Sequence, residues 1–202
     1  MDQETYDYIL SGKKTDFKPH EDLSGVILSG FDMSGINLRG ADMRGAKLSG
    51  TNLLNSDLTG ADMRGADMSG ANLRGANLAF ANFNGTNMIG ADLKGADLEG
   101  AKLTCACLRS ADLSGADLTS ANFNWADLSH GKLNGALLRG TNFISANLSS
   151  ADLTGVKLEL TDFTDANLNN MNSKGSELVE QFLIGAELRE DGSIYSINEN
   201  SL

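Results

Sequence analysis

The chain has 202 residues and a net charge of −11, with 16 Lys and Arg against 27 Asp and Glu. This length suits one domain with a buried core. The acidic balance argues against a protein that binds nucleic-acid phosphates, because such proteins need clustered Lys and Arg. Two Cys cannot build a disulfide framework, two His leave little material for a metal site, and no apolar run approaches about 18 residues. We therefore expect a cytoplasmic protein with no membrane span, no bound nucleic acid, no metal and no cofactor.

The first unit, residues 1–20, is predicted to be a capping helix followed by an irregular segment. Asp2 suits the N-cap of a helix over residues 2–10, and a Gly follows the end of that helix. Tyr6, Ile9 and Leu10 have the i, i+3, i+4 spacing of one helix face. We expect that face to cover the end of the structure that follows.

Residues 21–170 divide into 30 consecutive five-residue blocks with no insertion. The third position of every block is apolar, the first is Ala in 19 blocks, the second is Asp or Asn in 23, and the fifth is Gly in 18. A period of five fits neither an α-helix nor a flat strand. It fits a coil that turns a corner every five residues, with the first and third side chains inside and the other three outside. Gly suits the corner, since a positive φ is unfavourable for residues that have a Cβ.

The number of sides in each coil follows from the Phe residues at third positions. Phe83, Phe123, Phe143 and Phe163 are separated by multiples of 20 residues. If four blocks make one coil, all four Phe lie on the same side of a square rod. The 30 blocks then make about 7.5 coils, and at about 4.8 Å per coil the rod is about 36 Å long.

The repeated pattern of Ala, Asp or Asn, Leu, any residue and Gly resembles the pentapeptide-repeat family. Residues 111–115 match the pattern in full, residues 61–65 match it with Met in place of Leu, and the resemblance covers about three quarters of the chain. It implies an all-β protein that folds as a right-handed quadrilateral parallel β-helix, in which the handedness comes from the family. Most members of this family have no assigned activity.

The last unit, residues 171–202, is predicted to be a degenerate coil, a hairpin-like cap and a tail. The apolar third position is lost at Ser173 and is back in phase at Leu188. Two interpretations of residues 176–190 stay open: a degenerate coil, which the phase favours, and a helix. A turn signal at residues 190–193 predicts a β-type cap. Because the chain supplies its own caps at both ends, we favour a monomer over an end-to-end dimer.

No arrangement of residues indicates an enzyme. His20 and His130 are far apart in the repeat, and no outward Ser has an apparent base and acid beside it. Cys105 and Cys107 form a Cys-x-Cys pair, which supplies too few ligands for a metal site. We interpret the pair as reduced surface thiols, and a redox role is the open alternative. We therefore predict no catalytic, cofactor-binding or metal-binding residue.

An outward aromatic residue marks a candidate contact with a partner. Trp125 occupies a fifth position, where Gly is usual, and Cys105 and Ile144 lie in the coils on either side. Large aromatic side chains often dominate the binding energy of an interface. Trp125, Ile144 and Cys105 are therefore the predicted contact. A second side of the rod exposes three further apolar positions: Phe80, Leu137 and Leu160.

Two roles fit a rod of this kind. The first is a non-enzymatic, rigid scaffold that binds another protein, since repeat solenoids provide long surfaces. The second comes from the family resemblance, because some members bind DNA gyrase and give quinolone-type resistance by mimicking duplex DNA.

The charges favour the scaffold over the gyrase binder. The best acidic ladder, Asp22, Asp42 and Asp62, is only three coils tall. Duplex DNA about 36 Å long would carry about 21 negative charges. Residues 21–170 hold 17 acidic and 11 basic residues, a net charge of −6.

Overall fold

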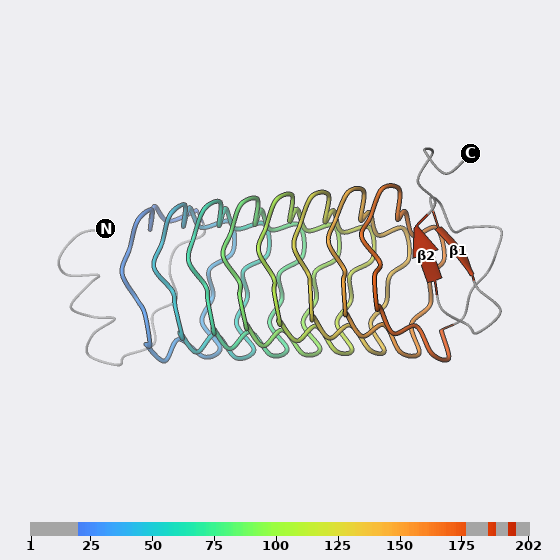
Figure 1. Cartoon of the computed structure of the whole chain (residues 1–202). Helices are drawn as coiled ribbons and strands as arrows, with labels where there is room; N and C mark the ends of the chain where they lie inside the picture. Colours follow the sequence, from blue (N-terminus) through green and yellow to red (C-terminus); the bar gives the residue numbers. More distant parts are fainter. Residues whose placement is uncertain (1–19, 177–185, 189–193, 197–202) are drawn as a thin grey trace.

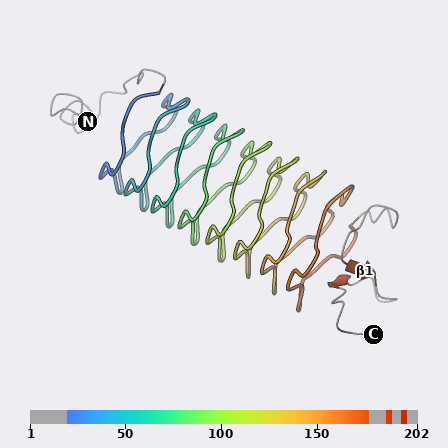
Figure 2. The ribbon, with the colours of Figure 1, turned by 90° about the horizontal axis from the view of Figure 1, so that it is seen from above.

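The computed structural model describes residues 20–176, 186–188 and 194–196. Residues 20–176 form a stack of similar coils (Figure 1), and the regular spacing of the coils is also clear in the view from above (Figure 2). Each five-residue block places its second residue in a β-bridge and its fourth and fifth residues in a turn. The same short backbone unit is therefore repeated along the rod.

The bridges join second-position residues that are 20 positions apart, in parallel register. They run from the pair Asp22 and Asp42 to the pair Asp152 and Asn172. Backbone N–H groups donate to carbonyl groups of the neighbouring coils in the same register. Four blocks therefore make one coil, and the chain is a parallel β-helix, as the sequence predicts. The handedness and the number of coils stay predictions.

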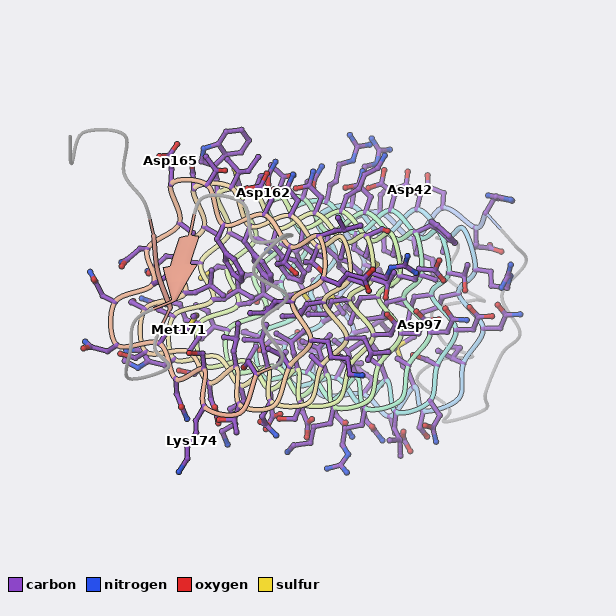
Figure 3. All side chains as sticks on the ribbon, turned by 90° about the vertical axis from the view of Figure 1, so that its right-hand side faces the viewer. Asp42, Asp97, Asp162, Asp165, Met171 and Lys174 are labelled. Atoms are coloured by element: carbon purple, nitrogen blue, oxygen red, sulfur yellow. The ribbon has the colours of Figure 1, made fainter. Side chains whose placement is uncertain are left out.

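The four blocks of a coil give the rod four faces, which we number in chain order. The first face begins with residues 21–25, the second with 26–30, the third with 31–35 and the fourth with 36–40, and each face continues every 20 residues. Figure 3 shows the rod obliquely, with the last coils toward the left and the first coils toward the right. Asp42 and Asp162 of the first face lie along its upper side, and Lys174 of the third face lies at its lower side.

The core consists of the side chains at first and third positions. Every third-position side chain from Leu23 to Phe163 is at most 2% exposed. On the first face, the ring centroids of Phe123 and Phe143 are 5.2 Å apart, and those of Phe143 and Phe163 are 5.4 Å apart. The inward positions and the shared Phe column therefore lie where the sequence predicts them. Buried apolar area and stacked rings stabilise this core.

The corners lie at the fifth positions of the blocks. Every fifth-position residue from His20 to Gly175 has a positive φ, between 53° and 74°. This conformation costs a residue with a Cβ about 1–2 kcal/mol. Gly therefore occupies most corners, although 13 of them carry another residue.

The Asp and Asn residues at second positions hold the turns that follow them. Asp22 accepts the backbone N–H of Ser24 at 3.0 Å, and Asp117 accepts that of Thr119 at 2.9 Å. Some Asn side chains also bond between coils: Asn72 donates to Asn52 at 2.9 Å, and Asn167 donates to Asn147 at 3.1 Å. Such turn-forming bonds explain the Asp and Asn preference structurally, without a role in chemistry.

Buried Thr hydroxyls replace Ala at a few first positions. The hydroxyl of Thr51 donates to the carbonyl oxygen of Leu28 at 2.7 Å, and that of Thr141 donates to Leu118 at 2.8 Å. Two more Thr residues make the same bond: Thr86 and Thr161. A buried hydroxyl without a partner would cost about 1–3 kcal/mol, so these bonds make Thr acceptable in the core.

The regular geometry continues for one block beyond residue 170. Asn172 forms a bridge with Asp152, Ser173 is 5% exposed, and Gly175 has a φ of 69°. A Ser at the third position therefore does not end the coil, because the corner and the bridge persist without a large apolar side chain.

Two short strands lie near the C-terminus. β1 (Ala186–Leu188) and β2 (Ile194–Ser196) pair in antiparallel register. They flank the turn predicted at residues 190–193, which lies outside the described residues, as does the helix predicted over residues 2–10. Two interpretations were open for residues 176–190, and the helix is wrong for residues 186–188, because they form β1. Residues 177–185 also lie outside the described part of the chain.

Candidate partner-binding surfaces

The described part of the chain offers no metal centre. Within it, no group of three or more His, Cys, Asp or Glu side chains could hold a metal ion. His20 and His130 occupy corners of the fourth and second faces, more than five coils apart along the chain. Cys105 is exposed at a corner and Cys107 is half-buried on the second face, and both thiols are free. Among the same residues, no helix is long and apolar enough to cross a membrane.

The predicted acidic ladder exists, but arginines bind most of it. Asp22, Asp42 and Asp62 are bridged in sequence on the first face. Arg44 donates to both carboxylate oxygens of Asp42 at 2.8 and 2.6 Å, and Arg64 donates to those of Asp62 at 2.9 and 2.6 Å. The pKa of each of these two carboxyl groups lies below its usual value, and the hydrogen bonds from the arginines are the largest cause. The ladder therefore presents paired charges rather than a row of free negative charges.

The third face also mixes charges of both signs. Lys94 lies 3.0 Å and Lys132 3.7 Å from the Asp112 carboxylate, measured from nitrogen to oxygen. Burial raises the pKa of the Asp112 carboxyl, but hydrogen bonds from Ser114 and Lys94 together outweigh it and lower the pKa. This face, like the first, lacks a continuous acidic surface.

The structure brings the predicted Trp125 contact together at the edge between the first and second faces. Trp125 is 59% exposed, and its backbone N–H donates to the carbonyl oxygen of Ile144 at 3.0 Å. Cys105 occupies the same corner one coil earlier. Asp165, at the same corner two coils later, lies at the upper left of Figure 3. We name Trp125, Ile144 and Cys105 the Trp125 edge.

A buried acceptor without a partner lies beside the Trp125 edge. The side-chain oxygen of Asn124 is buried and has no hydrogen-bond partner within the described residues. The equivalent oxygen of Asn84 accepts the backbone N–H of Thr104 at 2.9 Å. At Asn124 this bond is lost, because Asn142 already accepts the N–H of Ile144 at 3.0 Å. The sequence pattern predicts no such site; its only signal is residue 142, which is Asn where the block of Thr104 has Lys102 at the equivalent position.

The other exposed apolar residues fall mainly on the fourth face. Phe80 and Leu160 occupy its corner with the first face, and Leu137 occupies one of its second positions. Ile27, 62% exposed on the second face, was missed by the sequence analysis. Its signal was available, since Ile27 stands at a second position where Asp or Asn is usual.

The family comparison agrees with this geometry. The family model described as "Pentapeptide repeats (8 copies)" matches residues 22–55, 52–88, 81–119 and 121–159. The chain belongs to the pentapeptide-repeat family. No curated protein matches it.

Solved structures of other pentapeptide-repeat proteins are similar to the chain. HetL, described as involved in heterocyst differentiation regulation in Nostoc sp. strain PCC 7120, is 27% identical over 96% of this chain and 100% of its own, with a TM-score of 0.38. The protein alr5209 of Nostoc PCC 7120 is 36% identical over 58% of this chain and 83% of its own, with a TM-score of 0.31. QnrB1, a plasmid-mediated fluoroquinolone resistance protein, is 15% identical over 81% and 94%, with a TM-score of 0.40. TM-scores this low carry no argument about role.

Proposed function

We propose that this pentapeptide-repeat protein is a non-enzymatic scaffold that binds another protein through the Trp125 edge. It acts as a cytoplasmic monomer, and the rod holds the edge rigid. The observation that carries the proposal is the indole of Trp125, which is 59% exposed at a corner with a φ of 57°.

Trp at this corner is unfavourable for the isolated chain. A residue with a Cβ costs about 1–2 kcal/mol in this conformation, and Gly65 and Gly85 occupy the same corner without that cost. The ring also stays largely in water, so folding recovers little of its apolar area. A strained, exposed aromatic residue is accounted for by a contact outside the chain, where Trp is a frequent anchor.

The rigid backbone adds to this binding role. Each coil is hydrogen-bonded to its neighbours from residue 20 to residue 176, so the edge needs no ordering before a partner binds. Contacts that are already ordered lose less conformational entropy on association.

The test compares two baits that differ at the edge. Wild-type protein and Trp125→Gly are immobilised, and the proteins that they retain from a lysate of the source organism are quantified by mass spectrometry. We expect at least one protein to be depleted about tenfold or more by the substitution, as for an interface anchor. Because the chain contains one Trp, the purified partner should also shift the emission of Trp125 to shorter wavelength.

A substitution at another edge is the matched control. Phe80→Gly replaces an exposed aromatic residue with the same corner geometry, φ 59°, and should retain the partner. Equal retention by wild type and Trp125→Gly would refute the proposal.

Binding to DNA gyrase, with quinolone-type resistance, is the second candidate role. The paired carboxylates of Asp42 and Asp62 argue against it, because DNA mimicry needs free negative charge. In a supercoiling assay with purified gyrase, with and without a quinolone, we expect neither inhibition nor protection at low micromolar protein. Inhibition that Asp42→Asn and Asp62→Asn abolish would favour the gyrase binder instead.

A further inference from the structure

The fourth face carries a second exposed surface, separate from the Trp125 edge. Of the five exposed large hydrophobic side chains in the described residues, three belong to it, with exposed fractions of 61%, 49% and 46%. We name the following residues the fourth-face patch: Phe80, Asp97, Glu99, Asp117, Leu137 and Leu160.

The two ends of the patch are apolar residues at strained corners. Phe80 has a φ of 59° and Leu160 a φ of 58°, so each bears the cost of a Cβ in this region, about 1–2 kcal/mol. The corners of the three coils between them carry only small residues: Gly100, Ser120 and Gly140. Four coils at about 4.8 Å separate Phe80 from Leu160 by about 19 Å.

Phe80 lies over the beginning of this interval. A Cβ at Gly100 would come within 2.7 Å of the ring atoms Cδ1 and Cε1 of Phe80. The ring therefore leans along the rod toward Leu160. A partner could pack an apolar side chain on the exposed side of this ring. That side chain would then lie beside the corners that carry only Gly or Ser.

The centre of the patch is acidic. Asp97 and Asp117 are paired in adjacent coils, and Glu99 is two residues from Asp97. Asp97 and Asp117 accept backbone N–H groups at 2.9 Å, from Glu99 and Thr119. Within the described residues none of the three carboxylates has an ion pair, in contrast to the lysine-paired Asp112. Three negative charges without an ion pair therefore lie in the two coils that follow Phe80. The basic residues of this interval lie nearer Leu160, where Arg139 pairs with Glu159 at 3.6 Å and Lys157 occupies a second position.

We propose that the fourth-face patch binds a basic, amphipathic helix of a protein partner. Apolar side chains near the ends of the helix pack on Phe80 and Leu160, and Lys or Arg side chains between them face Asp97, Glu99 and Asp117. A second copy of this chain is a poor occupant, because two chains that each carry −11 repel each other at an acidic centre. This proposal does not depend on the Trp125 edge.

The probe is a synthetic peptide with the required pattern. An Ala-based helix of about 16 residues carries leucines at i and i+11 and lysines at i+4 and i+7, so that all four lie on one face. A fluorescent label reports binding by anisotropy. The control peptide carries glutamates in place of the two lysines. We expect the lysine peptide to bind wild type at least about tenfold more tightly than the control peptide, and to weaken as salt is raised.

Three variants locate the binding on the protein. Phe80→Gly restores the usual corner residue, and it should weaken the lysine peptide about fivefold or more. Asp97→Asn with Asp117→Asn keeps the side-chain oxygen that caps each turn, so it should fold normally, weaken binding and reduce its salt dependence. Trp125→Gly should bind as wild type does. On wild type, the emission of the single Trp should not change on binding.

The inference is wrong if the two peptides bind alike, or if Phe80→Gly and the Asn variant bind as wild type does. It is also wrong if the patch pairs two copies of the chain. In that case sedimentation would show a dimer that Phe80→Gly dissociates. Failure of this inference is distinct from failure of the proposed function. The proposed function fails only when Trp125→Gly retains the same partners as wild type.

Discussion

At the corners of the rod, a single backbone angle decides which residues fit at low cost. All fifth positions from His20 to Gly175 have a positive φ, whether or not the residue is Gly. The surrounding turn therefore imposes the angle, and each residue with a Cβ accepts it. Phe80, Trp125 and Leu160 are the bulky apolar residues among these corners, and both proposed surfaces contain them.

The cost of a Cβ at a corner is testable at Gly85. A Cβ there would meet no atom within 4 Å, so the effect of Gly85→Ala is conformational rather than steric. We expect a loss of about 1 kcal/mol in the free energy of unfolding, measured by urea denaturation. Ser145→Ala at the same corner, where φ is already 56°, is the control and should change stability by less than about 0.5 kcal/mol. Equal effects of the two substitutions would contradict the argument.

The paired carboxylates of the first face predict a change in titration. The pKa of Asp42 lies below its usual value of about 3.9, mainly because the Arg44 side chain donates to the carboxylate. Since folding lowers this pKa, the pair stabilises the fold above about pH 4, and the stabilisation is lost as the pH falls through the folded-state pKa. Arg44→Gln should raise the pKa of Asp42, as followed by carbon NMR of the carboxyl group. The pKa of Asp22, which Ser24 lowers, should stay low, and a fall in the pKa of Asp42 would contradict the assignment.

At the scale of a coil, three Phe rings of the first face stack on one another in consecutive coils. Phe143 stacks on Phe123 on one side and on Phe163 on the other. Phe143→Ala should cost about 3–5 kcal/mol, because the neighbouring backbone cannot close the cavity. Phe143→Leu restores the commonest third-position residue and should cost less, with two stacking contacts of about 0.5–1.5 kcal/mol each lost. Urea denaturation measures both, and a smaller cost for Ala than for Leu would show that the column is not packed as described.

The coil was largely predictable because its rules repeat every five residues. Leu113 and Gly115, for example, could be placed inside and at a corner from their block positions alone. The bonds that cross between coils could not be predicted in this way. The bond from Thr51 to Leu28 joins residues 23 positions apart, and the pairing of Asp112 with Lys94 depends on side-chain reach across a face. The five-residue period predicts whether a residue lies inside, outside or at a corner. It does not predict which side chains meet between coils, because that depends on their positions in space.

The same limit applies to the candidate surfaces. Trp125 was predicted as a contact because it breaks the Gly pattern at the corners. Ile27 breaks the Asp and Asn pattern at second positions in the same manner, so the same rule predicts its exposure. The unpaired oxygen of Asn124 depends on a competing acceptor in the next coil. A sequence pattern that treats each block separately cannot show that competition.

For the whole molecule, the register of 20 residues means that each coil contacts only the coils before and after it. Asp112, for example, bridges Asp92 in one direction and Lys132 in the other. The stability of such a rod is approximately a sum of coil terms and interfaces between neighbours. Removal of a whole coil should therefore leave the rod folded. Removal of half a coil should change its stability, because it brings side chains of different columns together.

Deletion of residues 101–120 removes one full coil and tests this prediction. Asn82 then bridges Asn122, and Phe83 meets Phe123, so every column continues and one Phe contact is gained. Deletion of residues 101–110 is the matched control, because it keeps the inward pattern but rotates the following coils by two faces and separates these two rings. We expect both variants to fold with the β signal in circular dichroism. In the 20-residue deletion, the new contact between Phe83 and Phe123 should contribute about 0.5–1.5 kcal/mol, measured by urea denaturation as the stability lost when Phe83→Leu is added to that deletion. If the 20-residue deletion aggregates or loses the β signal while the control folds, the coils are not equivalent units, and contacts beyond nearest neighbours hold the rod together.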